Sequence, residues 1–134
     1  MEKTMRLILA TLLLACAMPA AAADRYSGHY QRECGPHVCE LRMLPSGRDS
    51  WHLKWTATDP RDHTLTPVCE FETEVELGSA VVGGTTVTGI AVGEAQGRPF
   101  GVFDLDPGRV SISSSWEACT GLAPKGIYES VGDE

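Results

Sequence analysis

The sequence predicts an all-β protein, either a single small up-and-down meander β-barrel of seven to eight strands or a two-sheet sandwich, with two disulfides. Short segments of alternating apolar and polar residues recur along the chain, and glycine- and proline-rich turns separate them. After the first 23 residues, no segment has the apolar period of an amphipathic helix. A closed barrel is the favoured architecture, because closure removes the exposed edges at both ends of a sheet.

The segment 69–77 is the clearest predicted strand, because it alternates without exception. One set of positions is apolar or small, namely Cys69, Phe71, Thr73, Val75 and Leu77, and the other set is Glu70, Glu72, Glu74 and Glu76. Successive side chains of a strand point to opposite faces of the sheet. We therefore expect the first set to face the core and the four carboxylates to face water, since burying unpaired charges is costly.

Seven further segments have strand character. They cover residues 24–34, 38–44, 51–57, 85–92, 100–105, 110–116 and 126–131. Turn residues fall between them at 35–37, 45–47, 83–84 and 106–108, and loops are expected at 58–67, 93–97 and 118–124. Gly89, inside a run of β-branched residues, indicates a bulge or a bend.

Two similar tripeptides lie near opposite ends of the chain. Gly28-His29-Tyr30 belongs to the first expected strand and Gly126-Ile127-Tyr128 to the last. In a closed barrel the first and last strands are neighbours, so the similarity favours a barrel over a sandwich.

The first 23 residues have the features of a secretory signal peptide. Lys3 and Arg6 form a positive region, residues 7–14 are apolar, and the alanines at 21–23 suit a signal peptidase. The apolar run is too short to span a membrane. Cleavage after Ala23 would leave residues 24–134 as a single all-β domain in the periplasm or outside the cell.

A second interpretation of the same segment is a lipid anchor. Residues 13–16 resemble a bacterial lipobox, in which Cys16 would be lipidated and become the first residue of the exported protein. This alternative predicts an outer-membrane lipoprotein, whereas cleavage after Ala23 predicts simple release.

Four cysteines follow the signal segment: Cys34, Cys39, Cys69 and Cys119. An even number in a small exported domain predicts two disulfides, for which three pairings exist. We expect Cys34–Cys39, across a short hairpin loop where facing residues lie close enough for a bridge, and therefore Cys69–Cys119. The first pair resembles the motifs of thiol oxidoreductases, but four residues separate its cysteines instead of two, so redox catalysis is not expected.

Charge limits the classes of partner. The whole chain carries a formal charge of −7, and the signal segment contributes +1 through Lys3, Arg6 and Glu2, which leaves −8 for the remainder. Nucleic-acid binding requires a positive surface, so this class is not expected. The four histidines show no metal-binding spacing and no Gly-x-Ser-x-Gly motif is present. We therefore expect no metal, no cofactor and no enzymatic activity.

Two functional hypotheses remain, with an enzyme third. The first is an exported, non-enzymatic protein-binding module, an inhibitor of a basic partner such as a cell-wall hydrolase or a toxin, which docks through Glu70, Glu72, Glu74 and Glu76. The second is a carrier of a small apolar ligand whose barrel mouth is lined by tryptophans, although Trp51, Trp55 and Trp116 have their ordinary place in a core. The third is a hydrolase of unfamiliar design.

One short run resembles a known family. Ser27-Gly28-His29-Tyr30 is similar to the Ser-Gly-x-x-Tyr run of the membrane-bound class of bacterial lysozyme inhibitors, but it is one residue shorter. Those inhibitors are also small, exported, acidic and disulfide-stapled barrels. The resemblance covers four residues, and no inhibitory residue can be transferred from it.

Overall fold

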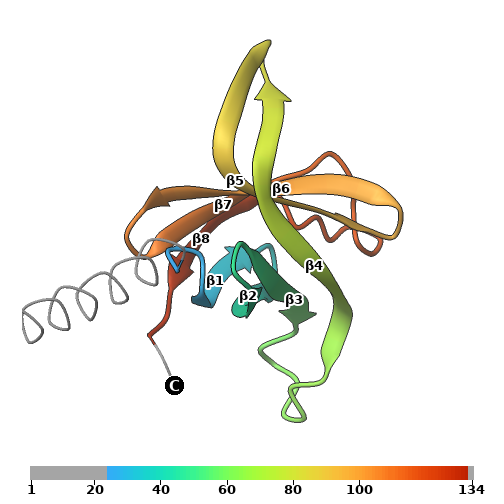
Figure 1. The fold of residues 1–134 in the computed structure, drawn as a ribbon. Coiled ribbons are helices and arrows are strands. Elements are labelled where there is room, and N and C mark those ends of the chain that lie inside the picture. The colour runs from blue at the N-terminus through green and yellow to red at the C-terminus, as the bar shows by residue number, and fades with distance from the viewer. Residues whose placement is uncertain (1–23, 133–134) are drawn as a thin grey trace, which may run out of the picture.

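The computed structural model describes residues 24–132, which form a closed antiparallel barrel of eight strands (Figure 1). The strands are β1 (Gly28–Cys34), β2 (His37–Gly47), β3 (Ser50–Thr58), β4 (Pro67–Val82), β5 (Thr85–Ala95), β6 (Arg98–Asp106), β7 (Arg109–Ser113) and β8 (Gly126–Ser130). Each strand pairs with the next one along the chain. The predicted up-and-down barrel is thus confirmed, and the sandwich is not formed. The signal segment and Cys16 lie outside the described residues.

The barrel closes between its first and last strands. Tyr30 of β1 is paired with Ser130 of β8, and Gln31 with Glu129. The two Gly-x-Tyr segments are therefore on neighbouring strands, as predicted. The side chains of Tyr30 and Tyr128 both point inward and are almost fully buried.

Side chains fill the interior of the barrel, and the largest of these side chains are aromatic. Trp51 and Trp55 are fully buried, and the ring of Trp55 stacks on that of Phe71 with 5.4 Å between centroids. The indole Nε1 of Trp55 donates a hydrogen bond of 2.9 Å to the hydroxyl of Tyr128. This bond satisfies the one polar atom that the tryptophan carries into the core.

Both predicted disulfides are present. Cys34 and Cys39 have Cα atoms 6.0 Å apart, and Cys69 and Cys119 have Cα atoms 6.1 Å apart. The first bridge closes the turn between β1 and β2. The second ties the start of β4 to the segment between β7 and β8. Two disulfides are compatible with an extracellular or periplasmic location.

Several strand boundaries differ from the prediction. The first strand begins at Gly28 and not at Asp24, and β2 continues to Gly47 through the turn expected at 45–47. Residues 93–97 were expected to be a loop, but β5 continues to Ala95, which pairs with Arg98, so only Gln96 and Gly97 form the turn. Both turn residues have positive φ, as a tight hairpin requires. Trp116 was expected in a strand, but β7 ends at Ser113 and the Trp116 indole instead donates a 2.8 Å hydrogen bond to the carbonyl of Pro99.

The hairpin of β4 and β5 extends well beyond the barrel (Figure 1). β3 begins at Ser50, opposite Glu76, whereas β4 continues to Val82, and among residues 24–132 this extension pairs with β5 alone. We call residues 77–90 the arm. Leu77 was expected to be buried, but it is 40% exposed, and Val75 is the last residue of β4 in the core.

A bulge at Gly89 sets the base of the arm. Gly78 pairs with Ile90 and Ser79 with Thr88, so Gly89 is the extra residue, as its position in the sequence predicted. Its φ of 77° is one that glycine adopts without steric cost. The Gly89 carbonyl accepts a 2.7 Å hydrogen bond from the Tyr26 hydroxyl, which fixes the N-terminal segment to the arm.

Candidate functional site

The four glutamates predicted to bind a partner lie together on the outer face of β4, and all are exposed. We call Glu70, Glu72, Glu74 and Glu76 the acidic stripe. Between them, Cys69, Phe71 and Val75 point into the core, and Thr73 is partly buried. The alternation in the sequence therefore predicts the core-facing and the water-facing residues of β4 correctly up to Val75.

The neighbouring strand β3 adds polar side chains to the same surface. Its register places His52 opposite Glu74 and Lys54 opposite Glu72. Sequence reasoning did not connect these residues with the stripe. The signal was available in the polar positions of 51–57, because consecutive strands of a meander pair and a cross-strand neighbour shares the same face.

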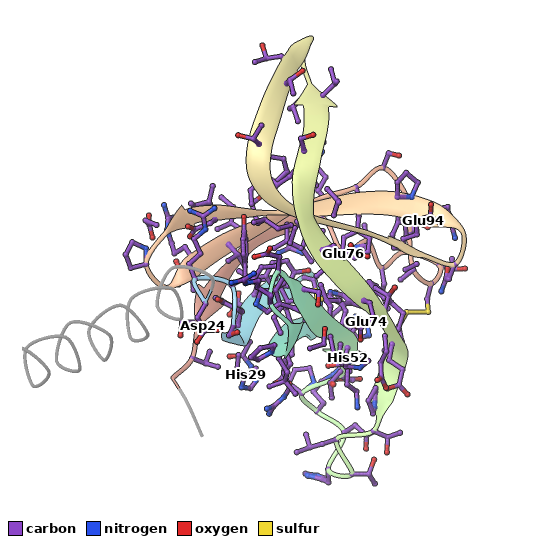
Figure 2. The ribbon with its side chains drawn as sticks, viewed as in Figure 1. Asp24, His29, His52, Glu74, Glu76 and Glu94 are labelled. Atoms are coloured by element: carbon purple, nitrogen blue, oxygen red, sulfur yellow. A yellow bond between two sulfur atoms is a disulfide. The ribbon has the colours of Figure 1, made fainter. Side chains whose placement is uncertain are left out.

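The imidazole of His52 bridges two carboxylates of the stripe. Its Nε2 atom lies 2.7 Å from Oε1 of Glu72, and its Nδ1 atom lies 2.7 Å from Oε2 of Glu74. Figure 2 shows His52 and Glu74 side by side on the outer surface of the barrel. The Ser46 hydroxyl, from the end of β2, donates a 2.6 Å hydrogen bond to the other oxygen of Glu74.

These contacts shift the protonation of both partners. Hydrogen bonds to Glu72 and then to Glu74 raise the pKa of His52 above its ordinary value of 6.5. Hydrogen bonds from Ser46 and then from His52 lower the pKa of Glu74. The side chains of His52 and Glu74 are 41% and 56% exposed, so solvent screens the interaction and its net contribution to stability is small.

The two ends of the stripe differ from its middle. In the described part of the chain, 24–132, ion pairs involve Glu72 and Glu74 but not Glu70 or Glu76. Opposite these two lie Thr56 and Ser50, which carry no charge. The stripe therefore has one uncompensated carboxylate at each end, Glu70 and Glu76. The two glutamates that His52 bridges lie between them. Exposed carboxylates at this spacing can accept hydrogen bonds from lysine or arginine side chains.

The three tryptophans were the other candidates from the sequence, either as core residues or as the lining of a barrel mouth. Trp51 and Trp55 are in the core, and Trp116 is buried at its edge, so all three tryptophans have the position that is ordinary for this residue in a core. Within residues 24–132, no three His, Cys, Asp or Glu side chains are placed to hold a metal ion. Over the same residues there is no helix of the length and hydropathy needed to cross a membrane.

No family model, no curated protein and no solved structure shows significant similarity to this chain. Function must therefore be inferred from the residues themselves and their geometry.

Proposed function

We propose that the protein is an exported, non-enzymatic binding module that docks a basic protein through the acidic stripe. The observation that carries this proposal is the placement of four exposed glutamates on one strand, with only one histidine and one lysine directly opposite them. Like charges in a row repel one another, so the row costs the isolated protein some stability. A partner with lysine or arginine side chains at this surface would remove that repulsion.

The rigidity of the surface supports docking of a preformed site. The stripe lies on a strand that pairs with β3 along all four glutamates, up to Glu76, and that pairs with β5 on its other side from Val75 onward. The Cys69–Cys119 disulfide holds the start of the same strand. A site on a regular strand loses little conformational entropy when a partner binds, which favours affinity.

The class of partner follows from charge and compartment. The exported chain would carry −8, and its four disulfide-bonded cysteines suit an oxidising compartment. A basic cell-wall hydrolase or a basic toxin is a protein of the required charge in that compartment. We place the module in the periplasm or outside the cell, released after Ala23 or, as the alternative, anchored to the outer membrane through Cys16.

The direct test is capture of a partner by the exported chain, residues 24–134 with both disulfides formed. The immobilised chain is exposed to an extract of exported proteins at low salt, and bound proteins are identified by mass spectrometry. The proposal predicts a stoichiometric basic protein that is released when salt is raised, because screening weakens attraction between exposed charges. Capture of only acidic or neutral proteins, or of none, would contradict it.

A further inference from the structure

The arm carries no charged side chain, in contrast to the rest of the surface. Residues 77–93 contain no Asp, Glu, Lys, Arg or His, although 29 of the 134 residues are acidic or basic. Val81 is 71% exposed and Val82 46% exposed. Apolar side chains grouped on a projecting element indicate an interaction surface.

The arm also has an unpaired sheet edge on its β4 side. The amide of Leu77 donates to the carbonyl of Asp49, and beyond it no strand among residues 24–132 pairs with that side of Ser79–Val82. The β5 side is partly covered, since the Gly89 carbonyl accepts hydrogen bonds from Tyr26 and Arg25. Exposed edge strands usually carry charges or prolines that prevent pairing, and Ser79–Val82 has neither.

A groove of about 500 Å³ continues this surface toward the barrel. Its apolar lining includes Val81 and Ile90 from the arm, and Phe100 and Phe103 from β6. Residues 79–82 therefore also line an apolar concave surface on the face of the sheet that β4, β5 and β6 form.

We propose that the arm pairs with the arm of a second copy of this chain, through antiparallel pairing of the two β4 edges at Ser79–Val82. A two-fold contact brings the same patch of both copies together, so the patch must be compatible with itself. An uncharged edge that includes Val81 and Val82 meets this condition. The acidic stripe does not, because its four glutamates would face the same four glutamates of the second copy.

The arm does not suit a basic partner. It has no carboxylate to pair with lysine or arginine, so the partner of the acidic stripe has no electrostatic reason to bind it. The two surfaces predict opposite effects of salt: higher salt weakens docking at the stripe, whereas it strengthens association of two acidic copies by screening their repulsion. Failure of one proposal therefore leaves the other standing.

The test is sedimentation equilibrium of residues 24–134 over a range of protein concentrations, at low and at high salt. We expect a monomer–dimer equilibrium that shifts toward the dimer at high salt. A monomer at every concentration and at both salt levels would overturn the proposal, and so would assembly beyond a dimer.

Two matched variants test the edge. Val81→Glu places a carboxylate on the paired edge, and Thr86→Glu places the same charge on the exposed residue directly opposite it in β5. We expect V81E to weaken dimerisation about tenfold and T86E to weaken it less, because V81E places the charge on the strand that pairs with the second copy and T86E places it one strand further away. Circular dichroism and thermal unfolding show whether each variant keeps the monomer fold. Equal loss in both variants, or no loss in V81E, would overturn pairing through β4.

Discussion

The Nδ1 atom of His52 lies 2.7 Å from a carboxylate oxygen of Glu74, while its other ring nitrogen is equally close to Glu72. An imidazolium donates hydrogen from both nitrogens, whereas a neutral imidazole donates from only one. The bridge is therefore complete only when His52 is protonated. This arrangement couples the charge of the acidic stripe to pH.

The first prediction concerns the pH dependence of stability. Because the folded pKa of His52 is raised, its contribution is fully present below the ordinary value of 6.5 and is lost as pH rises through the folded value. The difference in unfolding free energy between the native chain and His52→Gln should thus be larger near pH ~5.5 than near pH ~8.5. Urea unfolding at both values measures it. A difference that does not change with pH would contradict the bridge.

A nuclear magnetic resonance titration tests the same bridge at one side chain. In the double variant Glu72→Gln and Glu74→Gln, the carboxylates that raise the pKa of His52 are gone, so this pKa should fall. The fold should be unchanged, because both glutamates are exposed. A His52 pKa that stays raised in the double variant would show that another group causes the shift.

The second prediction concerns the core. Trp55→Ala should lower the unfolding free energy by about 3–5 kcal/mol, because it removes a large buried ring and leaves a cavity. Trp55→Phe keeps much of the ring but removes the donor to Tyr128, so its cost should be smaller. Chemical denaturation of both variants checks the order. A loss below about 1 kcal/mol for Trp55→Ala would show that this site is not well packed.

The third prediction separates the two disulfides. Cys69–Cys119 joins residues 50 positions apart, and Cys34–Cys39 joins residues five apart. On the chain-entropy model, removal of Cys69–Cys119 lowers the unfolding free energy by about 4 kcal/mol, and removal of Cys34–Cys39 lowers it by about 2 kcal/mol. Replacement of each pair by alanine, followed by urea unfolding, measures both. The opposite order would show that native-state strain or packing outweighs loop length.

Much of the fold could be predicted from local patterns. The alternation at 69–77 identified β4 and its two faces, and the Gly-x-Tyr segments indicated which strands close the barrel. The disulfide across the first hairpin followed from proximity, and the second followed from it. These features depend on the two-residue period of a strand, on the residues that favour turns, and on the short distance that a disulfide can span. All three can be judged from the sequence.

The arm and the histidine bridge could not be predicted in the same way. β4 leaves the barrel at the point where β3 begins. This point is set by the register between the two strands, and the residues of β4 alone do not indicate it. Leu77 continues the alternation and yet is exposed for this reason. The contact of His52 with Glu72 and Glu74 needs the register of two strands, which period alone leaves open.

The final prediction concerns the acidic stripe as a binding surface. Glu70→Gln with Glu76→Gln removes two uncompensated charges and leaves the His52 bridge intact. A matched control is Glu33→Gln with Glu129→Gln, which removes two exposed charges from β1 and β8, strands that do not adjoin β4 in the barrel. Both double variants should fold as the native chain does.

The most direct measurement is the affinity and association rate of these two variants with the captured basic partner, at low and high salt. The stripe variant should bind more weakly, mainly through slower association, and its loss should shrink at high salt because screening already removes part of the attraction. The control should bind almost as the native chain does. Unchanged affinity of the stripe variant at both salt levels, or an equal loss in the control, would contradict docking through the acidic stripe.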